Sequence, residues 1–125
     1  MEPTIIGAWM WTTSVDAVRL VQRSRFDKEV SEAHVWKRFE MDRLLVVDDL
    51  GIGGLTDDQF AIIWRLTDIR QRLPTIYTTN YSPEQLRERY DPRIVSRVCC
   101  GTIIEVVGAD RRLAGAKNYV VRVKS

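Results

Sequence analysis

The sequence of 125 residues predicts an α/β domain built on a parallel sheet. Short apolar runs alternate with amphipathic stretches, in the order strand, helix, strand, helix, strand, helix, strand. The run at 44–47 is apolar at every position, which is typical of a strand that is buried in a parallel sheet. No linker, repeat or shift in composition divides the chain, so we expect a single domain over residues 1–125.

Local signals predict the elements of the first half. Residues 5–12 are apolar and partly aromatic, which favours a strand. We expect Ser14 to cap the helix that follows, in which valines recur at helical spacing. A second short amphipathic helix is expected around 32–39, before the strand at 44–47.

Capping-box patterns begin two helices of the second half. Thr56 has Gln three residues later and Ser82 has the same spacing, the pattern in which side chain and backbone satisfy each other at a helix start. The first of these helices must end before Pro74, and the second runs to about Tyr90. The other expected elements are a strand at 75–79, a short helix at 92–97, a strand at 102–107 and a last strand at 119–123.

Composition limits the class of protein. With 45% hydrophobic and 29% charged residues, the chain is of globular type rather than collagen-like or disordered. No apolar run approaches the ~20 residues that a membrane-spanning helix needs, and residues 1–4 lack the basic start of a secretory signal. The only two cysteines, Cys99 and Cys100, are adjacent and form no disulfide framework. We therefore expect a cytoplasmic protein without a membrane partner.

The net charge of +2 is small, but the charge is unevenly distributed. Residues 42–58 carry a net charge of −4, and residues 110–125 carry +4. An acidic segment suits a cation and a basic segment suits phosphate. The alternative is a solvated surface whose charges neutralise each other.

Polar residues follow two of the expected strands, and ligands of parallel sheets bind at the carboxyl ends of strands. The run at 44–47 leads into Asp48 and Asp49, the pattern of a Walker B motif. The first carboxylate would hold Mg²⁺, and the second would orient or deprotonate a water molecule that attacks a γ-phosphate. Asn80 ends the next strand, where its amide would contact that phosphate and water. The alternative is that these are ordinary strand ends and turns.

Two pairs of arginines are candidate phosphate ligands. Arg93 and Arg97 are four residues apart, so they share a face of their short helix. Arg111 and Arg112 follow the strand at 102–107. A guanidinium group is always charged and binds phosphate oxygens with two N–H groups. An exposed basic surface is again the alternative.

Taken in order, these motifs resemble those of the AAA+ helicase loaders and transposition ATPases of the DnaC, DnaI and IstB type. The resemblance implies a P-loop NTPase fold, with ATP and Mg²⁺ bound between the subunits of an oligomer. It also implies that the protein acts with a replicative helicase or a transposase and binds single-stranded DNA. The similar segments are 44–51, 74–80, 96–98 and 108–112, with 11–15 similar to the strand–helix junction that precedes Walker B.

The resemblance also implies roles for single residues. Asp48 would be the magnesium-site acid of Walker B, Asp49 the catalytic acid and Asn80 the sensor 1 residue. Among the arginines, Arg97 would be the arginine finger that reaches the ATP of a neighbouring subunit, and Arg93 would lie close by. Arg112 would be the sensor 2 arginine, or Arg111 if the match is shifted by one residue.

One motif of that family has no counterpart here. No Gly-x-x-x-x-Gly-Lys-[Ser/Thr] stretch occurs in the sequence, because Gly51, Gly53 and Gly54 are not followed by Lys-Ser or Lys-Thr. In the family this loop precedes the segment matched here. We therefore expect an AAA+ core without its first β–P-loop–α unit, whether as a truncated gene product, an excised fragment or a remnant.

Three functions remain open from the sequence. The chain could be an ATP-binding module of a helicase loader or transposition helper, although without a P-loop we expect it to bind ATP weakly and not to hydrolyse it alone. It could instead be a non-catalytic interaction module that joins or inhibits a replication or transposition assembly. The third option is a small α/β domain with an unrelated site.

Overall fold

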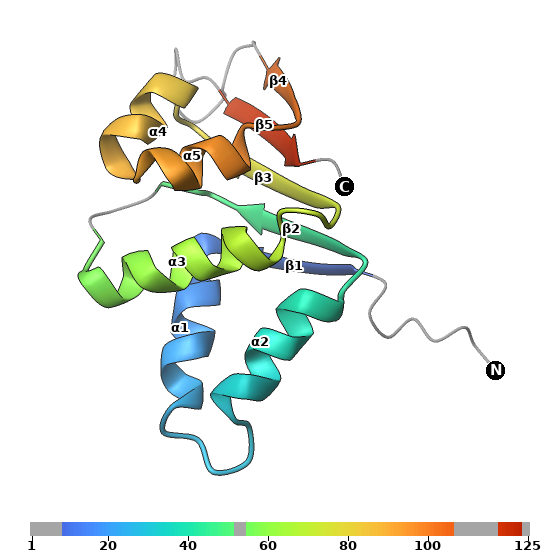
Figure 1. Ribbon diagram of the computed structural model, residues 1–125, viewed down its shortest axis with the longest axis vertical. Helices are drawn as coiled ribbons and strands as arrows, with labels where there is room; N and C mark the ends of the chain where they lie inside the picture. Colours follow the sequence, from blue (N-terminus) through green and yellow to red (C-terminus); the bar gives the residue numbers. More distant parts are fainter. Residues whose placement is uncertain (1–8, 52–54, 107–117, 124–125) are drawn as a thin grey trace, which may run out of the picture.

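The computed structural model describes residues 9–51, 55–106 and 118–123, and for 106 and 118–123 it describes the backbone alone. Strands and helices alternate through β3, as expected (Figure 1). No helix of these residues is long and apolar enough to cross a membrane. The elements are β1 (Trp9–Thr13), α1 (Ser14–Ser24), α2 (Glu32–Met41), β2 (Leu44–Asp48), α3 (Asp57–Ile69), β3 (Thr75–Thr79), α4 (Pro83–Arg89), α5 (Pro92–Val98), β4 (Thr102–Val106) and β5 (Asn118–Val123).

The five-stranded sheet has the order β1-β2-β3-β5-β4. β1, β2 and β3 run parallel to one another, so the predicted α/β class with a parallel sheet is confirmed for this part. β5 lies between β3 and β4 and is antiparallel to both, so the expectation of a wholly parallel sheet was wrong. Residues 107–117 are fewer than the dozen or so that a crossover to a parallel neighbour requires.

One face of the sheet carries the core. Leu45, Val47 and Tyr77 are at most 1% exposed, and one cluster of buried residues joins them to residues from all five helices. Leu44 and Val46, which alternate with these on β2, are only half-buried. The prediction that β2 is buried on both faces is therefore correct for one face only, because the helices of the described residues all contribute to the same core.

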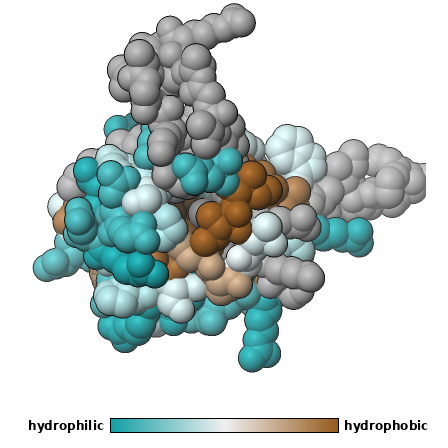
Figure 2. Space-filling view, turned by 90° about the horizontal axis from the view of Figure 1, so that it is seen from above, coloured by the Kyte–Doolittle hydropathy of each residue, from teal (hydrophilic) through white to brown (hydrophobic). Residues whose placement is uncertain are grey.

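The two outer strands, β1 and β4, carry exposed apolar side chains. On β1, Trp9 and Trp11 are 60% and 53% exposed, because alternation turns them away from the core. On β4, Ile103 and Ile104 are 43% and 50% exposed. Figure 2 shows hydrophobic atoms at the surface near the middle of the face that it draws. Apolar side chains are therefore available to solvent on both outer strands.

Side-chain caps begin the helices. Thr13, rather than the predicted Ser14, caps α1: its hydroxyl accepts a hydrogen bond from the backbone N–H of Asp16. Both capping boxes are confirmed, at Thr56 for α3 and at Ser82 for α4. Ser14 is already helical, which leaves its hydroxyl available for a contact with the loop after β2.

Candidate functional site

The predicted Walker B acid lies at the carboxyl ends of neighbouring parallel strands. Asp48 is the last residue of β2, and its Oδ1 accepts a hydrogen bond from the hydroxyl of Thr78 on β3. On the other side, Asp48 is in register with Thr13 at the end of β1. Asp48 is half-buried, and among the described residues no hydrogen bond reaches its Oδ2. Within the described part of the chain, one carboxylate oxygen of Asp48 is thus held by Thr78 and the other has no hydrogen-bond partner.

Asp49 follows in an unusual backbone conformation. Its φ of 57° lies in the left-handed region, which Asp tolerates better than most residues with a side chain. Its N–H donates to Thr78 Oγ1 over 3.1 Å, and its carbonyl accepts from Ser14 Oγ over 2.8 Å. Contacts from β3 and α1 therefore hold the backbone of Asp49 in place.

Asn80 lies just past the end of β3, two residues after Thr78, and is exposed. Since β2 and β3 are adjacent and parallel, Asp48 and Asn80 lie at adjacent strand ends, as predicted. The residue directly beside Asp48, however, is Thr78. The backbone just after Asp48 is also bound to the end of β3, because the N–H of Leu50 donates a hydrogen bond to the carbonyl of Thr78 over 2.8 Å.

The loop after β2 packs closely against the start of α4. Gly51 has a φ of 95°, and a Cβ atom placed on it would lie 2.9 Å from the ring of Tyr81. Both the positive φ and the close approach require glycine here. The guanidinium of Arg89 lies over the same Tyr81 ring, 4.3 Å from its centroid. The packing of Gly51 against Tyr81 therefore also helps to position Asp48 and Asp49, which precede Gly51 in the chain.

The donor set at this strand end suits a hard cation that keeps most of its water. Asp48 and Asp49 supply carboxylate oxygens, and Thr78 supplies a hydroxyl. No group of three or more His, Cys, Asp or Glu residues that could hold a metal ion occurs among the described residues. Mg²⁺ commonly binds through one or two carboxylates and retains several water molecules, so these residues fit it better than Zn²⁺.

Arg97 is engaged within its own chain. Its Nη2 lies 3.1 Å from Oδ1 of Asp68, and its guanidinium lies 4.7 Å from the centroid of the Trp64 ring. The side chain is only 17% exposed, and its Nη1 is buried and has no hydrogen-bond partner among the residues that the structure describes. The partner of Arg97 in this ion pair, Asp68, is on α3.

The remaining predicted arginines are less informative. Arg93 forms an exposed pair with Asp91, with 3.1 Å between its Nε and Oδ1 of Asp91, and this pair raises the pKa of Arg93 above its usual value. Arg111 and Arg112 lie outside the described residues, so their expected role as sensor 2 stays a prediction.

No family model, no curated protein and no solved structure matches this chain. The AAA+ resemblance therefore depends on the ordered motifs alone, and the parallel arrangement of β1, β2 and β3 is compatible with a Rossmann-like α/β core.

Two contacts of this site were not anticipated from the sequence. The sequence predicts a role for Asn80 rather than Thr78 at the end of β3, and it predicts Ser14 as the cap of α1. A signal for Thr78 exists: it is a hydroxyl residue at the end of a strand that is predicted to neighbour β2. No comparable signal exists for Ser14, because its partner, Asp49, is 35 positions away.

Proposed function

We propose that this chain is an ATP-binding AAA+ module of the helicase-loader and IstB-like type. In this proposal it contributes the metal-binding and water-positioning half of a nucleotide site between the subunits of an oligomer. It acts on single-stranded DNA together with a replicative helicase or a transposase. The observation that supports the proposal best is the contact between Asp48 and Thr78 at adjacent parallel strand ends, with Asn80 immediately beyond.

Each residue has a distinct task in this site. Thr78 donates to Oδ1 of Asp48 and so orients the carboxylate, while Oδ2 is available to a Mg²⁺ ion or its water. The fixed backbone of Asp49 limits where its carboxylate can accept a proton from an attacking water molecule. The exposed amide of Asn80 can donate to a γ-phosphate. Mg²⁺ would supply charge stabilisation for the transferred phosphoryl group.

Arg97 can serve as an arginine finger only if it exchanges Asp68 for the phosphate of a neighbouring subunit. Asp68 is 39% exposed, so the pair is near solvent and part of its attraction is screened. The buried and unpartnered Nη1 shows that the present contacts do not satisfy the whole guanidinium. The finger role of Arg97 therefore remains part of the proposal.

The second candidate function is a non-catalytic interaction module that joins or inhibits a replication or transposition assembly. The intrachain contacts of Arg97 with Asp68 and Trp64 favour it, because they give this residue a structural role.

A manganese titration followed by NMR distinguishes the two functions. Mn²⁺ accepts the same oxygen ligands as Mg²⁺ and broadens the signals of nearby nuclei. In labelled protein with ATP present, we expect the amide signals of Asp49 and Thr78 to broaden first. The substitution Asp48→Asn removes one charge but keeps the shape of the side chain, so this broadening should disappear.

Asp57→Asn provides the matched control. It also removes one carboxylate, from an exposed position in the first turn of α3, and should leave the broadening at Asp49 unchanged. If the broadening persists in Asp48→Asn, or if its centre is at 57–58, the proposed metal site is wrong. A chain that gives no broadening dependent on Asp48 is an interaction module.

A further inference from the structure

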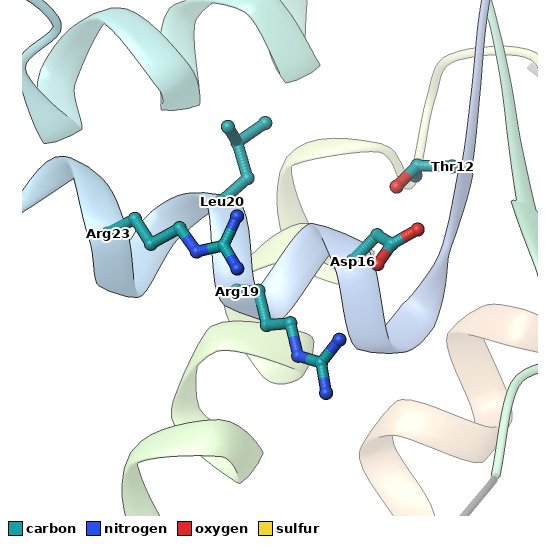
Figure 3. Close-up of a pocket in the computed structure, with 5 residues that line it drawn as sticks. All are labelled: Thr12, Asp16, Arg19, Leu20 and Arg23. Carbon is teal, nitrogen blue, oxygen red and sulfur yellow. The ribbon is translucent and has the colours of Figure 1, made fainter.

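A small hollow lies at the outer edge of the sheet, where β1 leads into α1. Its volume is about 250 Å³. Figure 3 shows that Arg19 and Arg23 extend from the same side of α1, with Asp16 near the start of the helix and Thr12 on the strand. None of these residues belongs to the strand-end site of Asp48. The hollow is lined by Thr12, Asp16, Arg19, Leu20 and Arg23.

The hollow carries an excess of positive charge. Arg19 and Arg23 are one helical turn apart and exposed, and neither forms an ion pair with any acidic group of the described residues. Asp16 is the one acidic residue among the described residues of the lining, and it lies in the first turn of α1, where the helix dipole favours a negative charge. Two unpaired guanidinium groups beside a polar hollow suit phosphate oxygens.

Two exposed indole rings lie on the same strand. Trp9 and Trp11 are on the face of β1 opposite to Thr12, roughly 7 Å apart along the strand. β1 is the outermost strand, and among the described residues it pairs with β2 alone. The rings and the arginines therefore flank the same free edge, with flat aromatic surfaces on one side and positive charge on the other.

We propose that the outer edge of β1 binds single-stranded nucleic acid. The phosphates lie along the edge and contact Arg19 and Arg23, while successive bases stack on Trp9 and Trp11. Base stacking on aromatic rings combined with a positively charged groove is the usual way to bind single strands of any sequence. Charge complementarity selects this occupant over a second copy of the chain, because pairing two β1 edges would bring two sets of unpaired arginines together.

The proposal rests on the proposed function for its single-stranded partner and adds the surface that binds this partner, which uses none of the residues of the nucleotide site. The test is a titration with an oligothymidylate of about 15 nucleotides, followed by tryptophan fluorescence at several salt concentrations. We expect quenching that saturates and that weakens as salt rises. In Arg19→Gln/Arg23→Gln, affinity should fall at least about tenfold, and the slope of log affinity against log salt should fall by about 1.4, or ~0.7 for each lost phosphate contact.

Two further variants separate the contributions. Arg72→Gln/Arg87→Gln removes the same charge from exposed positions before β3 and on α4, away from β1, and should leave affinity and salt slope close to wild type. Trp11→Leu should weaken binding about fivefold or more, because one stacking platform is lost. Circular dichroism confirms that each variant is folded.

Several results would overturn the proposal. Equal losses in the two double variants would mean that the attraction is general electrostatics. Quenching by inorganic phosphate or thymidine monophosphate at the concentrations that suffice for the oligomer would mean a mononucleotide pocket rather than a strand-binding edge. A fluorescence change that depends on protein concentration without the oligomer would assign the edge to a second copy.

Discussion

At the scale of single residues, the environment of Arg97 decides how it can act. The side chain of Arg97 is only 17% exposed and its guanidinium lies over the ring of Trp64, while its partner Asp68 is 39% exposed, so water screens part of the ion pair. Arg97→Ala should therefore destabilise the fold by about 1–3 kcal/mol, because it leaves Asp68 unpaired and uncovers the ring. Chemical denaturation measures this loss.

Arg93→Ala is the control for Arg97, since it removes an exposed arginine from the same helix and should change stability little. If both variants are equally stable, Arg97 has no structural role within the chain, and its function as an arginine finger becomes the better interpretation.

At the scale of elements, Arg70 connects several segments at the end of the sheet where the parallel strands begin. Arg70 is fully buried and donates to Thr75 Oγ1 and to the carbonyl oxygens of Phe39, Asp42 and Pro74. These contacts join the end of α2, the end of α3 and the start of β3. Burial lowers the pKa of Arg70 from its usual value, because a guanidinium charge is less stable away from water.

Replacing Arg70 should therefore be among the most destabilising single changes in this chain. Arg70→Met removes the donors from two buried carbonyl groups and one that is partly buried, and should cost about 3 kcal/mol or more. Arg70→Lys should recover only part of this, because an ammonium group cannot reproduce the planar fork. Exposed Arg72→Met is the control, and a similar loss there would contradict the structural role of Arg70.

A second network joins three helices and is sensitive to acid. Arg25 lies 2.6 Å from Oε1 of Glu32 on α2 and 2.8 Å from Oδ2 of Asp58 on α3. Hydrogen bonds from Arg25 lower the pKa of both carboxyl groups. A carboxyl group with a lowered pKa in the folded state stabilises the fold above its unfolded pKa, and this contribution is lost as pH falls through the folded value.

The network should therefore lose its contribution as the pH falls from about 5 to below 4, near the ordinary pKa values of Glu and Asp. We expect the wild-type chain to lose more stability over this interval than Arg25→Gln, in which the carboxyl pKa values return toward normal. Thermal unfolding at a series of pH values measures the difference. Parallel curves for the two proteins would show that the network contributes nothing.

At the scale of the whole molecule, the sheet depends on its last strand. β5 pairs with β3 on one side and β4 on the other, and among the described residues β4 has no other strand partner. Ending the chain at residue 117 should therefore release β4 while β1, β2 and β3 remain paired. Hydrogen exchange should show lost protection at 102–106 and retained protection at 45–47. Protection that persists at 102–106 would mean that β4 is held by other contacts.

Much of this architecture was predictable from local signals. Capping boxes at Thr56 and Ser82 and the apolar run before Asp48 depend on residues a few positions apart, so sequence spacing alone locates them. The placement of Asp48 and Asn80 at adjacent strand ends also followed from the alternation of strands and helices. The place of β5 did not, because antiparallel insertion between β3 and β4 depends on contacts between distant segments.

By itself, the sequence determined the class of the fold, the starts of α3 and α4, and the strand ends at which to look for chemistry. Only the tertiary structure decided that Thr78 is the partner of Asp48, that Asp68 holds Arg97, and that Arg19 and Arg23 share a hollow beside the edge of β1. Turns and caps are set by neighbouring residues. Contacts between side chains on different elements are set by the register and packing of those elements, which no short stretch of sequence contains.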